Sequence, residues 1–191
     1  MDLEVELLSE HSRKHAEKIA RWVGADAERL NQLMRFFLKG EYRIAQRAAW
    51  VVTIVADRHP FLLRPYLKRM LSRIQEPGIH DAVRRSVVRI LQEIEIPESL
   101  LGTVATLCFD ELSSAGSPVA VKCYAMTVLA HLAEQEPELG GELRLVIEQQ
   151  MPFASGGFPA AFVRYAKSAQ SRTICRAFRT DRREGQIAVT C

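Results

Sequence analysis

A basic residue that leads into an apolar run recurs along this chain at nearly constant intervals. The most complete copy is residues 81–91, where Val83-Arg84 precedes Val87-Val88. The equivalent basic residues are Arg47, Arg84, Lys122 and Arg164, and they are 37, 38 and 42 residues apart. A repeat of about 40 residues with helical patterning is typical of stacked helix pairs. The spacing therefore predicts a repetitive α-helical fold.

Proline residues mark the repeats a second time. Pro60 and Pro97 each follow the repeated basic residue by 13 residues, and Pro137 follows it by 15. Because the residue before a proline disfavours the α-helical conformation, each proline predicts a helix end. A shared basic residue followed by a shared helix end supports a true structural repeat.

Apolar residues at helical spacing predict a helix in almost every segment between these breaks, so we expect an all-α fold. Asp26 is a good N-cap for one of these helices, and Gly24 and Gly40 are typical of helix ends. The expected helices are residues 3–23, 26–39, 41–58, 61–74, 80–94, 98–112, 119–133, 138–151 and 159–170.

In this order the segments resemble the HEAT (armadillo-like) family of helical repeats. The best match has a first helix at 61–74, then Asp81, then a second helix that opens with Val83-Arg84. The resemblance covers about residues 26–170, although the repeat at 98–133 lacks the aspartate. It implies a right-handed α-α superhelix, a solenoid of about four helix pairs plus an N-terminal helix. We expect one domain at 1–170 and a basic tail at 171–191, which extends the last helix or is disordered.

Composition narrows the class of protein. The 191 residues include four cysteines but no Cys-x-x-Cys pair, and Cys108 and Cys123 sit in apolar surroundings. This usage suits a reducing cytoplasm. The acidic start of the chain does not resemble a signal peptide, and its longest central apolar run, 48–56, falls far short of the roughly 20 residues of a membrane helix. We expect a cytoplasmic protein with no membrane segment, cofactor or metal.

Charge is unevenly distributed. Residues 29–89 hold 13 basic and 4 acidic residues, residues 97–157 hold 2 and 8, and residues 158–191 hold 7 and 2. The first block suggests an anionic partner such as nucleic acid or another polyanion. The opposite signs of the other two blocks suggest that the tail folds back on the acidic block, or that the protein self-associates.

The repeated basic residues and their neighbours are the predicted partner-binding positions. In HEAT-like stacks the second helices line a concave face, so the resemblance places these side chains in a groove. The same resemblance offers a structural alternative, in which the arginine bonds to an aspartate or a backbone carbonyl and ties adjacent repeats together. The predicted groove residues are Arg43, Arg47, Arg84, Arg85, Lys122 and Arg164.

Other residue sets suggest chemistry only weakly. A nucleic-acid-binding protein related to DNA alkylation-repair glycosylases would need a carboxylate beside aromatic groups, and the candidates are Trp22, Trp50 and Asp57. Trp50 and Asp57 lie two helical turns apart, yet a core tryptophan and a solvated or capping aspartate explain them as well. His11 and His15 could share a metal with Glu10, but no third ligand is evident and a solvated helix face is simpler. No catalytic motif is recognisable. The favoured function is a non-enzymatic scaffold that docks another protein, and the alternative is the nucleic-acid-binding protein.

Overall fold

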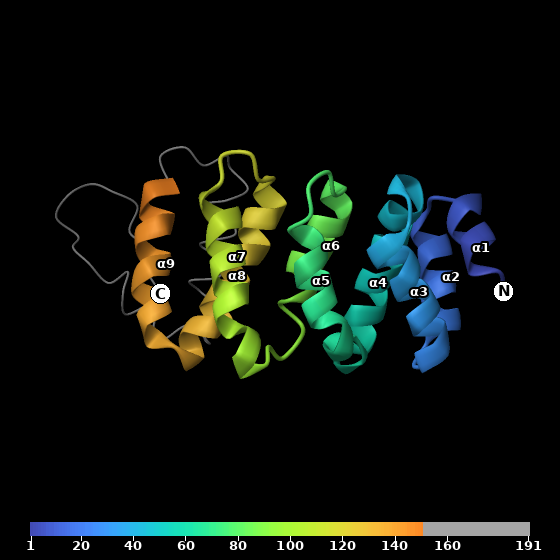
Figure 1. The fold of residues 1–191 in the computed structure, drawn as a ribbon, viewed down its shortest axis with the longest axis horizontal. Coiled ribbons are helices and arrows are strands. Elements are labelled where there is room, and N and C mark those ends of the chain that lie inside the picture. The colour runs from blue at the N-terminus through green and yellow to red at the C-terminus, as the bar shows by residue number, and fades with distance from the viewer. Residues whose placement is uncertain (151–191) are drawn as a thin grey trace. The chain divides into compact units, whose positions relative to one another are not determined.

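The structure, a computed structural model, describes residues 1–150, and these fall into two compact units, one of residues 1–100 and one of residues 101–150. All regular elements in the described part of the chain are helices (Figure 1), which confirms the all-α prediction. The predicted helix at 159–170 and the tail at 171–191 lie outside the described residues. The right-handed superhelix and the domain boundary at residue 170 stay predictions.

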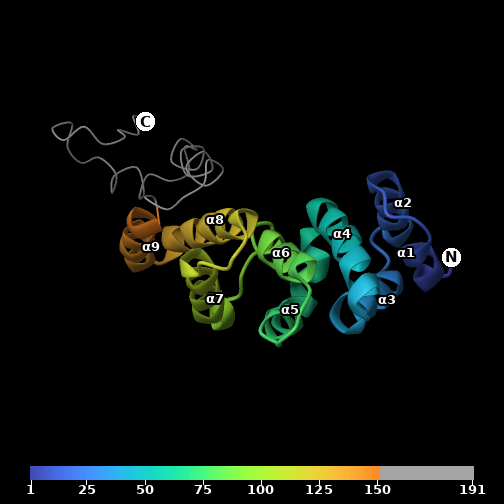
Figure 2. The same ribbon diagram turned by 90° about the horizontal axis from the view of Figure 1, so that it is seen from above.

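The first unit is built around α4 (Tyr42–Arg58), which packs against α1, α2, α3 and α6 (Figure 2). The central stripe of α4 is made of small and β-branched residues, so neighbouring helices can approach it closely. Ala48, Val52 and Val55 are almost fully buried. The other elements of the unit are α1 (Leu3–Ser9), α2 (Arg13–Val23), α3 (Ala27–Lys39), η1 (Pro60–Tyr66), α5 (Leu67–Ile74), α6 (Asp81–Ile90) and η2 (Glu98–Leu100).

The first predicted helix, 3–23, was wrong because it is two helices. The chain breaks between Ser9 and Arg13, and the Ser12 hydroxyl accepts a hydrogen bond from the His15 amide at 3.1 Å. A serine at this position satisfies one of the amides that a new helix leaves unpaired. The break allows α2 to turn back against α1. Gly24, with φ of 51°, then ends α2 in a conformation that side chains rarely adopt.

Helix α3 forms as predicted. The Asp26 carboxylate accepts hydrogen bonds from the amides of Glu28 and Arg29, both at 3.0 Å. The bond from Arg29 is the main reason why the pKa of Asp26 is lower than its ordinary value. The apolar face of α3 buries Leu33 and Phe37 completely.

Two predicted boundaries in the later part of the first unit need correction. Residues 61–74 are a 3₁₀ helix, η1, followed by α5, because Pro65 has no amide to donate within the first turns. Helix α6 begins after His80 as expected, but it ends at Ile90, four residues before the predicted end.

The second unit contains α7 (Leu101–Ser113), α8 (Val119–Gln135) and α9 (Pro137–Gln150), and α8 packs against both of the others. Its core is largely apolar, with Leu112, Met126 and Leu129 almost fully buried. Cys108 lies in this core, as predicted for a small hydrophobic residue. Burial raises the pKa of the Cys108 thiol from 9.0 to about 12, and the charge of Glu111 adds to the rise.

Candidate binding surface

Helices α4 and α6 lie side by side and run in the same direction. Near their starts, the rings of Tyr42 and His80 are 4.1 Å apart between centroids. Near their ends, Nη2 of Arg89 donates to both carboxylate oxygens of Asp57 at 2.9 Å. Contacts at both ends in the same order require a parallel pair. The structure thus brings the predicted basic positions of two repeats onto neighbouring helices.

Arg43 on α4 and Arg85 on α6 are exposed and make no ion pair with any residue in the described part of the chain. Each lies in the first half of its helix, close to the contact between Tyr42 and His80. Tyr42 is itself 69% exposed. This end of the helix pair therefore presents two available guanidinium groups and an aromatic ring to a ligand.

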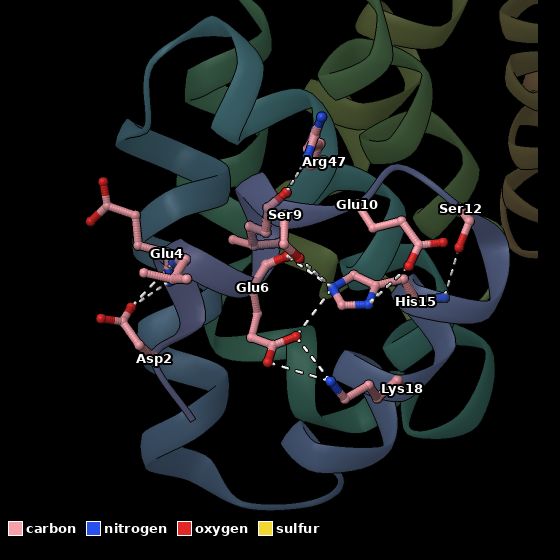
Figure 3. Close-up of polar contacts among 11 residues, drawn as sticks. Asp2, Glu4, Glu6, Ser9, Glu10, Ser12, His15, Lys18 and Arg47 are labelled. Carbon is pink, nitrogen blue, oxygen red and sulfur yellow. Dashed lines mark hydrogen bonds and ion pairs between the residues drawn. The ribbon is translucent and has the colours of Figure 1, made fainter.

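Arg47, the residue of the predicted repeat, has a different role. Its Nη1 donates to the backbone carbonyl of Leu7 at 2.8 Å, in the last turn of α1 (Figure 3). Carbonyls in the last turn of a helix lack an intrahelical partner, so this bond satisfies a group that the fold leaves open. Arg47 thereby ties α4 to α1 across 40 residues of sequence.

The same pattern holds in the second unit. Nζ of Lys122 on α8 donates to the side-chain oxygen of Gln150 on α9 at 2.8 Å. Arg84 on α6 is half-buried, and Arg164 lies outside the described residues. The repeated basic residue therefore contacts a neighbouring helix at both Arg47 and Lys122, through a backbone carbonyl at Arg47 and a glutamine side chain at Lys122.

Trp50 lies on the same side of α4 as Arg43 and Arg47, since the three residues are separated by four and three positions. It is half-buried, and its ring meets the ring of His11 edge-on at 5.3 Å. A shallow depression, with room for no more than about one water molecule, opens beside it. The depression is lined by Leu7, Glu10, His11, Ser12, His15, Ala16, Ile19, Arg47, Trp50 and Val51.

Asp57 is not available as a free carboxylate. Both of its oxygens accept from Arg89, and this ion pair links α4 to α6 on the partly exposed surface. A base-excision reaction would use a carboxylate beside aromatic groups to stabilise a cationic leaving base. The contacts of Asp57 and Trp50 are instead those of a helix-joining ion pair and a surface aromatic residue.

The His15 side chain of α2 makes several polar contacts, although the sequence favoured a solvated helix face at this position. Its side chain is 10% exposed, and Nε2 lies 2.9 Å from the backbone carbonyl of Glu6 and 3.2 Å from a Glu6 carboxylate oxygen (Figure 3). Lys18 joins the same carboxylate at 3.1 Å. These contacts fasten α2 to α1.

The surroundings of His15 do not assemble a reactive group. Ser9 Oγ lies 3.2 Å from Nε2 and Glu10 lies 3.8 Å from Nδ1, which superficially resembles a Ser-His-Glu set. However, Nε2 has the Glu6 carbonyl as its nearest acceptor, so it carries a proton and cannot take one from Ser9. Across residues 1–150, no three His, Cys, Asp or Glu side chains are grouped so as to hold a metal ion.

The sequence did not predict the contribution of His11 to this surface. The prediction paired His11 with His15, but the structure turns His11 towards Trp50 and His15 towards Glu6. The usable signal was the helix N-cap at Ser12, because a helix that starts after Ser12 leaves His11 in the connection and places His15 in α2.

Comparison with known proteins agrees with this geometry. Stacked helices with a basic residue at equivalent positions define a helical repeat protein. A family model for the HEAT repeat domain matches residues 3–160, and the chain belongs to this family. No curated protein and no solved structure shows significant similarity to it. Within the described residues, no helix is both long enough and apolar enough to cross a membrane.

Proposed function

We propose that this HEAT repeat protein is a non-enzymatic scaffold that docks an acidic protein segment on the face formed by α4 and α6. The observation that carries the proposal is the pair of exposed arginines, Arg43 and Arg85, on two adjacent parallel helices. Neither has an acidic partner among the described residues, so their charge is available to a ligand. HEAT repeats offer such helical faces to other proteins.

Tyr42 lies next to Arg43, and Trp50 lies two turns further along the same side of α4, so both can act as apolar anchors on this face. Tryptophan, tyrosine and arginine are the residues most often found at the energetic centres of protein interfaces. Trp50 borders the shallow depression beside α2, so an apolar side chain of a partner would rest on the Trp50 ring at the surface. A segment with an apolar side chain flanked by carboxylates fits this surface.

The surrounding basic residues favour a protein over nucleic acid. The guanidinium groups of three nearby arginines already pair with carboxylates: Arg64 with Glu95, Arg73 with Glu76, and Arg89 with Asp57. Phosphate binding depends on many uncompensated cations that displace counterions. These ion pairs leave three of the 13 basic residues at 29–89 less available to phosphate groups.

The remaining predicted groove residues are secondary in this proposal. Arg47 and Lys122 hydrogen-bond to Leu7 and Gln150, so a partner would compete with those contacts. Arg84 and Arg164 complete the predicted set. We assign the main contacts to Arg43 and Arg85.

The test is quantitative capture of partners from nuclease-treated cell extract by the full chain. The parent is compared with Arg43→Glu/Arg85→Glu and with a control, Lys68→Glu/Arg69→Glu, which changes the same charge on exposed residues of α5. We expect a protein that is retained by the parent and by the control and lost by the Arg43/Arg85 variant. All three chains should have the same unfolding midpoint, because the four residues are exposed.

Two results would overturn the proposal. One is equal capture by the Arg43/Arg85 variant and the parent. The other is capture that depends on nucleic acid, shown by tight binding of labelled DNA or RNA that falls steeply between 0.05 and 0.2 M salt. The second result would support the nucleic-acid alternative on the same residues.

A further inference from the structure

The outer side of α1 carries exposed apolar residues. Val5 is 62% exposed and Leu8 is 40% exposed, three positions apart on the helix, and Met1, one turn earlier, is 48% exposed. The opposite side of α1 buries Leu3 and Leu7 against the rest of the unit. Helix α1 is therefore apolar on two sides, although the fold covers only one of them.

An apolar outer side is unusual for the first helix of a repeat array. Terminal repeats normally present a polar outer face, because no further repeat covers them. A group of exposed apolar residues often marks an interaction site, whereas isolated exposed apolar residues are common on protein surfaces and need no explanation. Three of the seven large apolar residues that are exposed in the described part of the chain belong to this one short segment. The outer side of α1 is thus a candidate interaction surface.

Charge defines what this surface can accept. Residues 1–10 contain four carboxylates, at Asp2, Glu4, Glu6 and Glu10, and no lysine or arginine. By helical spacing, Asp2 lies next to Val5 and Glu4 lies next to Leu8. The carboxylates of Asp2 and Glu4 point away from His15 (Figure 3). An occupant must therefore be apolar and basic.

The chain contains a segment of that chemistry. Residues 172–183 include five arginines and one acidic residue, with the apolar residues Ile174 and Phe178 four positions apart. The arginines are Arg172, Arg176, Arg179, Arg182 and Arg183. We propose that residues 172–183 of a second copy of this chain dock on the outer side of α1. Ile174 and Phe178 would cover Val5 and Leu8, and the arginines would pair with Asp2 and Glu4.

Two other arrangements fit the same facts less well. Pairing of α1 with α1 of a second copy would bring Asp2 and Glu4 close to their own equivalents, and like charges oppose such contact. Docking within one chain would join the first and last parts of a repeat array, in which each repeat normally contacts only its neighbours. A second copy removes both difficulties.

This arrangement predicts weak, salt-sensitive and open-ended association. A few apolar side chains cover much less than the roughly 800 Å² per partner of a standard interface. A head-to-tail contact that does not close into a ring continues from copy to copy. We therefore expect the average mass to rise with protein concentration beyond that of a dimer, and to fall when salt is raised.

Sedimentation velocity of the full chain over a concentration series is the test. The variants are Val5→Lys/Leu8→Lys on the proposed surface and Arg176→Glu/Arg179→Glu on the proposed occupant. A matched control is Leu145→Lys, because Leu145 is 55% exposed on α9. The parent and the control should associate, and each of the two variants should remain monomeric.

Mixing the two monomeric variants gives the decisive result. Each retains one intact half of the interface, so an equimolar mixture should form a one-to-one dimer and nothing larger. No association of the parent at any concentration would overturn the proposal, and so would a mixture that stays monomeric or association that survives in either variant alone. The Arg43→Glu/Arg85→Glu chain should associate like the parent, so this test is separate from that of the α4–α6 face.

Discussion

The two units are held together in different ways. In the first unit, polar side chains join one helix to another: Arg47 binds the Leu7 carbonyl, His15 binds Glu6, and Arg89 pairs with Asp57. In residues 101–150, Lys122 on α8 donates to Gln150 on α9, and α8 buries an apolar stripe that includes Val121, Met126 and Leu129. The first unit has 17 basic and 14 acidic residues, and residues 101–150 have 2 and 7.

Basic side chains have two kinds of surroundings in this protein, since some bind an oxygen of a neighbouring helix and others are exposed without such a partner in the described chain. At Arg47 and Lys122 the repeated basic residue has the same role in both units, because it binds an oxygen on a neighbouring helix. The first unit has further arginines, and Arg43 and Arg85 are exposed without such a partner in the described chain. The proposed binding role therefore falls to the additional arginines of the first unit and not to the repeated basic residue.

The largest expected effect tests the apolar core of the second unit. Leu129→Ala removes a fully buried side chain from α8 and leaves a cavity, so the free energy of unfolding should fall by about 2–5 kcal/mol. Leu145→Ala, on the exposed side of α9, should change it by less than about 0.5 kcal/mol. Urea unfolding followed by circular dichroism measures both. Similar losses for the two variants would contradict the apolar account of this unit.

The next effect tests a polar tie in the first unit. His15→Ala removes the bond to the Glu6 carbonyl, which keeps the Ser9 hydroxyl as a donor, so the cost should be about 1 kcal/mol. His131→Ala, an exposed position on α8, is the control and should be close to neutral. Hydrogen exchange should show faster opening of α1 in the His15 variant. Unchanged protection of α1 would show that this tie is unimportant.

The buried thiol predicts a loss of stability at high pH. The pKa of Cys108 is about 12 in the fold and 9.0 in its ordinary state, so the folded chain holds this proton while the unfolded chain releases it. A raised pKa gives stability that is complete below pH 9 and lost as pH rises towards 12. Between pH 8 and pH 10 the loss should be about 1 kcal/mol.

Cys108→Val is the matched variant for this effect. It fills the same apolar site and cannot titrate, so its urea midpoint should fall less than that of the parent between pH 8 and pH 10. An identical fall in both chains would show that other groups cause the change. In the folded parent, Cys108 should also resist alkylation at pH 8, because the thiolate is the reactive form.

The smallest effect concerns the ion pair between α4 and α6. The side chains of Arg89 and Asp57 are 37% and 42% exposed, and pairs at such exposure contribute little. A double-mutant cycle with Asp57→Ala and Arg89→Ala should give a coupling energy of about 0.2–1 kcal/mol. A value near zero would mean that the ion pair does not stabilise the contact between α4 and α6, and that apolar packing and the ring contact of Tyr42 with His80 account for it.

Helices with local signals could be predicted from the sequence. Asp26 caps α3 and Pro60 follows the end of α4 because caps and prolines act within a few residues. The repeat spacing was enough to identify the family, since it reflects the stacking of similar helix pairs. The break before Ser12 was missed, because Ser12 stands in a polar stretch that also suits an exposed helix face.

The partners of individual side chains could not be predicted in the same way. Arg43 and Arg47 are four residues apart on one helix and chemically identical, yet only Arg47 reaches Leu7, 40 residues away. That difference depends on where α1 lies against α4, which no local pattern encodes. The helix at 80–94 was predicted too long for a related reason, because Pro97 limits where a helix can end but does not require it to continue that far.

The most direct test of the central claim compares Arg47→Ala with Arg43→Ala by urea unfolding under one set of conditions. If the repeated arginine is structural, Arg47→Ala should lower the free energy of unfolding by about 1–2 kcal/mol, because it removes a charged donor from the Leu7 carbonyl. Arg43→Ala should change it by less than about 0.5 kcal/mol. Equal effects of the two substitutions would contradict the division between structural and binding arginines.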